Sequence, residues 1–295
     1  MEQASSEVML LCDVNSILGE GPTWDHHSKK LIWVDIIGKR IHTFEPASGE
    51  VRTITIEQKI GSAVPRVEGG LVIALENGFH TLDLETEQLT KRIDPEKDMP
   101  GNRFNDGKCD EAGRFWAGTM DMKEKSPSGS LYCLETDGTV RRMVEGVTVS
   151  NGLGWSPDNQ TLYYIDSPTK KVMAYDYSLE RGEITNPRVA VTIPEGEGFP
   201  DGMTVDSQGM LWIAHWDGWQ VSCWNPETAE KIASIPVPAA QTSSCTFGGE
   251  NLDELYITTA RVGLSEEQLK DQPHAGGVFC IKPGINGRPA SFYGG

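Results

Sequence analysis

Positive charge is scarce in this sequence of 295 residues, because 26 Lys and Arg residues stand against 43 Asp and Glu residues. The formal net charge of −17 creates a field that repels phosphate backbones and anionic lipid headgroups. Long apolar runs are missing as well, and no stretch approaches the roughly 18 apolar residues that a membrane-spanning helix needs. We therefore expect the chain to bind neither nucleic acid nor membranes.

Leader-peptide features and paired cysteines are also absent. Residues 1 to 15 contain no Lys or Arg and only one short apolar run, from Val8 to Cys12, so they lack the basic and hydrophobic regions of a secretory leader. The six cysteines lie far apart without a Cys-x-x-Cys pair, which favours reduced thiols in the core over disulfides or a zinc cluster. These features predict a cytoplasmic protein with free thiols.

Helical periodicity is almost absent, whereas 32 glycines separate short β-branched and aromatic runs. This pattern indicates an all-β protein. A turn rich in Gly or Asp, followed by an apolar strand, recurs six times at intervals of 40 to 49 residues. Aligned positions in the six copies are occupied by Leu31, Leu71, Phe115, Leu162, Leu211 and Leu255.

A period of this length with several strands in each unit is typical of a β-propeller. Six copies fit the chain, so the sequence predicts a six-bladed β-propeller, with a β-sandwich of coincidental spacing as the alternative. No linker interrupts the period, which predicts a single domain over residues 1–295. We expect the amino-terminal strand to complete the last blade, which the segment 276–284 begins. Ser265 and Gln268 match a capping box and predict one short surface helix.

Four of the six repeats carry a carboxylate or carboxamide ten or eleven residues before the aligned strand position, namely Glu20, Asn105, Asn151 and Asp201. Equivalent positions in a ring of blades face one axis, so these side chains should converge at one end of the central channel. A glycine follows each within two residues, and the simpler interpretation is that these pairs only form turns. Turn formation explains neither Glu20 nor a spacing that four blades keep.

Repulsion between Glu20 and Asp201 in a narrow channel requires a cation to neutralise them. Oxygen ligands without His or thiolate indicate a hard ion, Ca²⁺, Mg²⁺ or Mn²⁺, with Zn²⁺ less favoured. An ion with open coordination positions can polarise a carbonyl, as ester or lactone hydrolysis requires.

The motif RFNDGK at 103–108 adds further residues near the channel mouth. Arg103 lies two residues before Asn105, where it either binds a hydroxyl or carboxylate or forms only a surface salt bridge. Asp106 is expected in an Asx turn, and Lys108, which follows this turn, is expected to be exposed.

Seven motifs follow one another along the chain: GEGPTW at 19–24, RFNDGK at 103–108, RFWAGTM at 114–120, SNGLGWSPD at 150–158, FPDGM at 199–203, LWIAHW at 211–216 and SSCTFGG at 243–249. In sequence and order they resemble the gluconolactonase family that includes regucalcin (senescence marker protein 30), over essentially the whole chain. The resemblance implies a six-bladed propeller that holds a divalent cation in its channel and hydrolyses aldonolactones.

Carried over by motif, the resemblance assigns Glu20, Asn151 and Asp201 as metal ligands. It assigns Arg103 and Asn105 as residues that bind the sugar lactone, and Asp201 also matches the family's proposed general base. Because a carboxylate that binds an ion is a weakened base, Asp201 must use its free oxygen or act through water.

The chain departs from the family's pattern in the segment MDMKEKSPSG at 120–129. Many animal members have a longer loop here, with an acidic residue that contacts the substrate. Lys123 lies where that acid is expected, and Asp121 or Glu124 replaces it only if the alignment shifts. The substrate preference is therefore left open.

Taken together, these features predict divalent-metal-dependent hydrolysis of a sugar lactone to the aldonic acid. Ca²⁺ is the first choice of ion, with Mg²⁺, Mn²⁺ or Zn²⁺ as alternatives. Two other hypotheses stay open: a metal-dependent hydrolase of other lactones or organophosphate esters, and a non-catalytic calcium-binding propeller. The sequence fits either a monomer or a small homo-oligomer.

Overall fold

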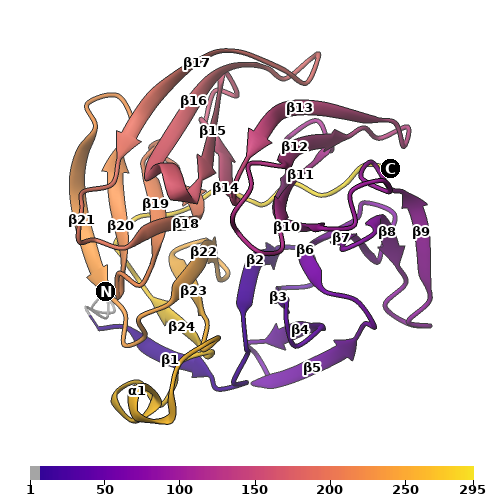
Figure 1. Ribbon diagram of the computed structural model, residues 1–295. Helices are drawn as coiled ribbons and strands as arrows, with labels where there is room; N and C mark the ends of the chain where they lie inside the picture. The colour runs from indigo at the N-terminus through magenta and orange to yellow at the C-terminus, as the bar shows by residue number, and fades with distance from the viewer. Residues whose placement is uncertain (1–6) are drawn as a thin grey trace.

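Six antiparallel sheets of four strands surround a central axis in the computed structural model of the protein (Figure 1). The predicted all-β, six-bladed propeller is confirmed, and the β-sandwich alternative is wrong. The structure describes residues 7–295, so residues 1 to 6, which begin the segment inspected for a leader, lie outside the described part.

From the inner to the outer strand, blade 1 consists of β2 (Gly19–Asp25), β3 (Lys30–Asp35), β4 (Arg40–Glu45) and β5 (Glu50–Thr55). Blade 2 consists of β6 (Ile60–Pro65), β7 (Leu71–Leu75), β8 (Gly78–Leu82) and β9 (Leu89–Ile93). Blade 3 consists of β10 (Asn102–Cys109), β11 (Phe115–Asp121), β12 (Gly129–Leu134) and β13 (Val140–Val147). Blade 4 consists of β14 (Ser150–Trp155), β15 (Thr161–Asp166), β16 (Lys171–Ser178) and β17 (Glu183–Thr192). Blade 5 consists of β18 (Phe199–Val205), β19 (Leu211–Trp216), β20 (Gln220–Asn225) and β21 (Glu230–Pro236). Blade 6 consists of β22 (Thr242–Gly248), β23 (Glu254–Thr259), β24 (Val278–Ile281) and β1 (Met9–Cys12). The six inner strands contact one another around the axis, in the order β2, β6, β10, β14, β18 and β22.

The ring closes where the two ends of the chain share blade 6. Strand β1 pairs with β24 in antiparallel register, with Met9 opposite Cys280 and Leu10 opposite Phe279. This pairing confirms the predicted closure, in which the amino-terminal strand covers an edge that would otherwise be open.

The recurring sequence segment forms the second strand of each blade, and its six aligned residues are all almost completely buried. The Asp-rich turn before this strand has a specific role in two blades. Asp206 Oδ1 accepts hydrogen bonds from the Gln208 and Met210 amides, and Oδ2 accepts one from Trp212 Nε1 at 2.9 Å. Asp110 makes the equivalent contacts in blade 3. The carboxylate therefore fixes both the turn and the indole of the following strand.

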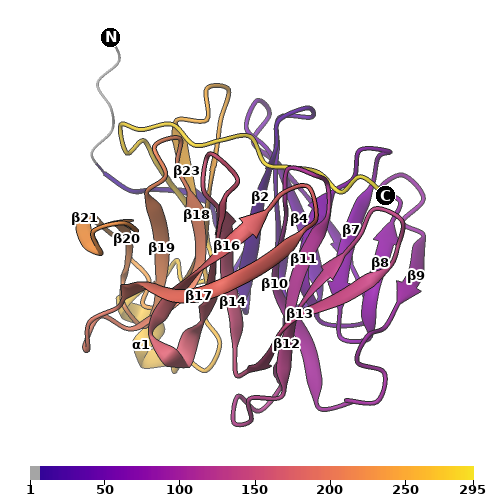
Figure 2. The ribbon, with the colours of Figure 1, turned by 90° about the horizontal axis from the view of Figure 1, so that it is seen from above.

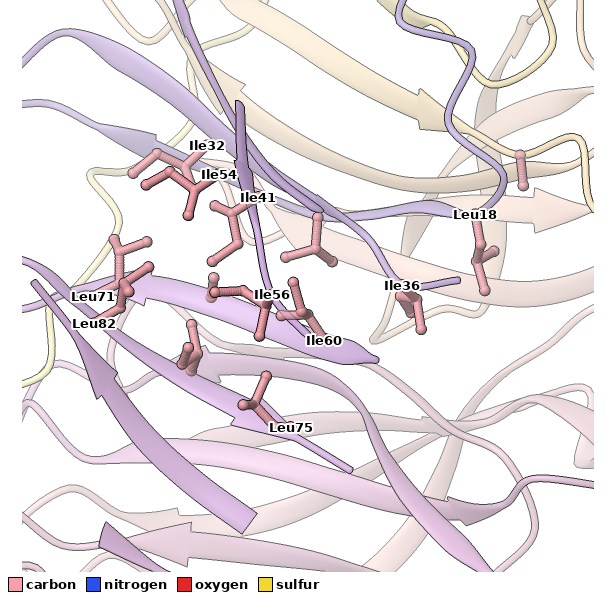
Figure 3. Packing of buried hydrophobic residues seen from close by; sticks show 14 residues of the cluster. Leu18, Ile32, Ile36, Ile41, Ile54, Ile56, Ile60, Leu71, Leu75 and Leu82 are labelled. Atoms are coloured by element: carbon pink, nitrogen blue, oxygen red, sulfur yellow. The ribbon is translucent and has the colours of Figure 1, made fainter. Parts of the chain in front are cut away.

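Apolar side chains fill each of the six interfaces between neighbouring blades. Between blades 1 and 2, Ile32, Ile41 and Ile54 face Leu71 and Leu82 (Figure 3). Burial of such side chains contributes roughly 1.5–3 kcal/mol each, so the position of one blade depends on its packing against the next.

The C-terminal segment, residues 286–294, crosses one face of the propeller in an extended conformation, and we call it the strap (Figure 2). Its backbone pairs with blade 5 through Asn286, with blade 6 through Gly287 and with blades 2 and 3 through Tyr293 and Gly294. Arg288 donates to the Ser156 carbonyl of blade 4 at 3.4 Å. The ring of Phe292 contacts His26 of blade 1. The strap thus contacts all six blades and covers one end of the channel.

The predicted helix is present as α1 (Glu266–Asp271), with the reciprocal capping-box contacts of Ser265 and Gln268. A short 3₁₀ turn, η1 (Ser167–Thr169), follows β15. All six cysteines, which lie within residues 7–295, are free thiols. No helix in this described range is long and apolar enough to cross a membrane.

Replacement of Asp206 by alanine should lower the free energy of unfolding by about 3 kcal/mol, because it leaves the buried Trp212 N–H and two turn amides without an acceptor. Asp83→Ala is a matched control, since Asp83 accepts from two turn amides, Glu85 and Thr86, but lies at the surface. Asp83→Ala should lower the free energy of unfolding much less than Asp206→Ala does, because water can replace the lost acceptor at the surface. Urea unfolding followed by tryptophan fluorescence measures both values, and equal losses would contradict this role of Asp206.

Candidate functional site

A cavity of 370 Å³ occupies the end of the channel opposite the strap, where the inner strands begin. All five residues singled out from the sequence line it, namely Glu20, Arg103, Asn105, Asn151 and Asp201. They come from blades 1, 3, 4 and 5, and each of the five is at least nine-tenths buried. The structure therefore brings together side chains that are distant from one another in the sequence.

A β-bulge places these side chains in the channel. Every inner strand has a register shift at the same level relative to its neighbour in the blade. Asn105, Asn151 and Asp201 lie within the shifts of their strands, and Glu20 directly precedes that of β2. A bulge releases a residue from the ladder and redirects its side chain, so the regular spacing in the sequence reflects a repeated backbone irregularity.

The glycines that follow these residues are required mainly by space. Only Gly21 has a positive φ, of 54°, as a turn glycine does. A Cβ on Gly152 would lie 2.7 Å from the Asp201 carbonyl oxygen, and one on Gly202 would lie 2.0 Å from Ser244 Oγ. These residues allow the inner strands to approach one another closely, which the turn interpretation does not explain.

Hydrogen bonds link the polar side chains of blades 3 and 4. Arg103 Nη1 donates to Asn105 Oδ1 at 2.7 Å. Asn105 Nδ2 in turn donates to the Ser150 carbonyl at 2.7 Å and to Asn151 Oδ1 at 3.1 Å. Each carboxamide oxygen accepts one hydrogen bond, but the donor to Asn105 is a guanidinium at 2.7 Å, whereas the donor to Asn151 is a neutral amide at 3.1 Å. The Asn151 oxygen is therefore the better placed of the two to bind a cation.

The carboxyl groups of Glu20 and Asp201 interact directly across the channel. Burial raises the pKa of both well above the ordinary range, and the charges of Asp201 and Asp106 raise that of Glu20 further. Burial also lowers the pKa of Arg103 from its ordinary value, while the nearby acids oppose this change. Two such carboxyl groups are compatible only if a proton or a cation lies between them.

The donor set fits a hard divalent cation. Two carboxylates and one carboxamide oxygen are available, and the described lining residues include neither His nor Cys. No cluster of three or more His, Cys, Asp or Glu residues that could hold a metal occurs within residues 7–295. Asn151 offers a carboxamide oxygen that could join Glu20 and Asp201 as a ligand.

The cavity lining extends beyond the five singled-out residues, and it includes Glu124, which the sequence left as an alternative within the segment 120–129. Glu124 lies in the loop between β11 and β12, and its left-handed backbone, with φ of 57°, accompanies a side chain that lines the cavity. Lys123 does not line the cavity. The Asp121 carboxylate instead accepts hydrogen bonds from three amides of this loop. Ser167 and Trp216 also line the cavity. A loop conformation and contacts between blades determine these positions, and neither leaves a periodic signal.

Lys108 lies in the channel, and the expectation that it is exposed is wrong. Its Nζ donates to the Met203 carbonyl at 2.8 Å, and burial lowers its pKa. The expected Asx turn at Asp106 is also wrong, because its carboxylate accepts from the amide of the next residue, Gly107, and not from one two residues on. Asp106 lies buried within β10. The bulge in β10 turns both side chains inward.

Comparison with known proteins identifies the family. The sequence model of the SMP-30/Gluconolactonase/LRE-like region matches residues 18–261, which include all five cavity residues named above. The chain belongs to this family. The family resemblance drawn from the seven motifs is therefore confirmed.

Relatives and solved structures cover nearly the whole chain. "Putative sugar lactone lactonase YvrE" of Bacillus subtilis (strain 168) is 37% identical, over 98% of this chain and 99% of that protein. Regucalcin of Xenopus laevis is 39% identical, over 98% of this chain and all of that protein. The crystal structure of a calcium-binding regucalcin from Agrobacterium tumefaciens strain C58 covers 96% of both chains, with 29% identity and a TM-score of 0.92.

The raised pKa values of Glu20 and Asp201 predict how stability depends on pH without a cation. The folded chain retains protons that the unfolded chain loses above about pH 4, so stability should fall as the pH rises towards neutrality. Glu20→Gln removes one of the two interacting charges. At pH 7 in chelator this variant should have a higher melting temperature than the unsubstituted protein. The increase should be about 2–4 °C for each kcal/mol by which its free energy of unfolding rises.

Scanning calorimetry between pH 5 and 8 measures this effect. Glu227→Gln, at an exposed turn, is the control and should leave the pH dependence unchanged. A Glu20→Gln variant that is less stable than the unsubstituted protein across this range would contradict the assigned electrostatics.

Proposed function

We propose that this protein hydrolyses an uncharged sugar lactone to its aldonic acid with the help of one divalent cation, preferably Ca²⁺, held by Glu20, Asn151 and Asp201. The observation that carries the proposal is the meeting of two buried carboxylates, a carboxamide oxygen and an arginine in one cavity. Membership of a family that includes a protein named as a sugar lactone lactonase supports the choice of reaction.

The side chains divide the work between binding and proton transfer. When bound, the cation supplies Lewis-acid polarisation of the lactone carbonyl. Arg103 uses Nη1 for its contacts with Phe104 and Asn105, which leaves Nε and Nη2 to donate to ring hydroxyls. Asp201 has two carboxylate oxygens, so one can hold the cation while the other accepts a proton from the attacking water.

Asp201→Asn should therefore reduce kcat/KM for D-glucono-1,5-lactone by about 10³-fold or more, since it removes the base and weakens cation binding. Asp217→Asn, at the rim of the same cavity, should change kcat/KM by less than about tenfold. A pH-stat assay with chelator-stripped protein and added Ca²⁺ measures both, with circular dichroism to confirm folding. Near-normal turnover by Asp201→Asn would refute the mechanism.

The charge of the cavity indicates which lactones it accepts. Four carboxylates line it, from Glu20, Glu124, Asp201 and Asp217, whereas Arg103 is the only cationic side chain among the described lining residues. A divalent cation and Arg103 together offset three of these four charges, so the cavity remains negative and repels anionic substrates.

D-glucono-1,5-lactone should consequently be a better substrate than its 6-phosphate, by at least about 100-fold in kcat/KM. The double variant Glu124→Gln/Asp217→Asn reduces the negative charge at the mouth and should narrow this difference. Initial rates above spontaneous hydrolysis provide the measurement. Equal or preferred hydrolysis of the phosphorylated lactone would exclude an uncharged substrate as the specific one.

A second candidate function is hydrolysis of other lactones or organophosphate esters at the same site. The observation that favours it is an apolar wall of the cavity, formed by Leu18, Met120, Val149, Phe199 and Trp216. Phe199 is 41% exposed and could cover an alkyl or aryl group that aldonolactones lack. A panel of aldonolactones, alkyl-substituted lactones and phosphotriesters, assayed with several divalent ions, separates the two candidates. If no compound of the panel is hydrolysed with any ion, the remaining hypothesis is a non-catalytic calcium-binding propeller.

A further inference from the structure

Ser167 lies outside the set of residues that the sequence singled out, although it lines the same cavity and is only 8% exposed. It begins η1, and its amide donates to the Val149 carbonyl at 3.1 Å. The Lys170 amide donates to the Ser167 carbonyl at 3.0 Å, and Pro168 restricts the backbone directly after it. The Ser167 hydroxyl is therefore held in a defined position.

This hydroxyl has two polar neighbours, and their chemistry fixes the direction of both hydrogen bonds. Ser167 Oγ lies 2.6 Å from the Pro200 carbonyl oxygen and 2.8 Å from Asn151 Nδ2. A carbonyl only accepts, so the single hydroxyl hydrogen of Ser167 points to Pro200. The hydroxyl oxygen can then only accept, which requires the amide nitrogen of Asn151 to face Ser167 and its oxygen to face away.

The other end of this hydrogen-bond chain has the same polarity. The guanidinium of Arg103 only donates, so it fixes the oxygen of Asn105 towards itself. The Asn105 amide nitrogen then donates to Asn151 Oδ1. The chain therefore begins at a group that only donates, ends at a carbonyl that only accepts, and joins blades 3, 4 and 5.

Orientation matters for Asn151 because the two ends of a carboxamide have nearly the same shape. Turned by half a rotation, the side chain fills the same space but presents an N–H₂ group, which repels a cation. In that orientation the Asn151 oxygen would face the Ser167 oxygen, and two acceptors without a hydrogen between them repel each other. The same hydroxyl also ties Asn151 to the residue that directly precedes Asp201.

We propose that Ser167 is a positioning residue, which presents the Asn151 oxygen to the cation and fixes Asn151 relative to Asp201. This inference rests on the proposed cation site. It concerns the orientation of one ligand. It predicts that substitution of Ser167 weakens cation binding when residue 151 is an amide but not when it is a carboxylate.

Calcium affinity of the full-length, chelator-stripped protein tests the inference, with Ca²⁺ alone titrated by calorimetry. Ser167→Ala should raise the Kd by about 10–100-fold, as loss of a group that orients a metal ligand does. In an Asn151→Asp background the same substitution should change the Kd by less than about threefold, because the two oxygens of a carboxylate are equivalent. Ser167→Thr retains the hydroxyl and should bind Ca²⁺ as the unsubstituted protein does.

An unchanged Kd in Ser167→Ala would overturn the inference. Equal losses with and without the Asn151→Asp substitution would also overturn it, because they indicate a merely structural role. If Ser167→Ala does not fold, Ser167→Cys takes its place in the same cycle. Absence of Ca²⁺ binding by the unsubstituted protein would refute the proposed cation, and the inference with it, whereas binding that is insensitive to Ser167 refutes the inference alone.

Discussion

The mutual repulsion of two buried carboxyl groups is the constraint on which the site depends. Glu20 and Asp201 come from blades 1 and 5, and burial raises the pKa of both. Such a pair costs free energy of folding unless a positive charge compensates it. The proposed function accounts for this cost, because a divalent cation bound between the two groups would compensate their charges. A loss of stability in return for function is common at active sites.

The propeller supplies the rigidity that keeps these groups together. Apolar side chains fill every interface between blades, and strand β1 and the C-terminal strap hold the ring closed. Because each inner strand is fixed by its neighbours, the bulges of all six lie at one level. The chain of hydrogen bonds from Arg103 to Pro200 then sets which atoms face the cavity.

Much of this arrangement could be predicted because it repeats. The intervals between Leu31 and its equivalents revealed six blades, and the constant offset of Glu20, Asn105, Asn151 and Asp201 indicated that they converge. Features that occur once could not be found in this way. Glu124 reaches the cavity through a left-handed backbone conformation in a loop, and Ser167 acts through a contact with another blade. Lys108 faces the channel because a bulge reverses the alternation of β10, which local turn chemistry does not reveal.

Anomalous diffraction from crystals soaked in Mn²⁺, which scatters more strongly than Ca²⁺ and prefers similar oxygen ligands, tests the central claim most directly. The account predicts one strong peak within coordination distance of Glu20, Asn151 and Asp201, and a much weaker peak in an Asp201→Asn crystal soaked in the same way. A channel without a peak in the unsubstituted protein, or a peak bound by other residues, would contradict it.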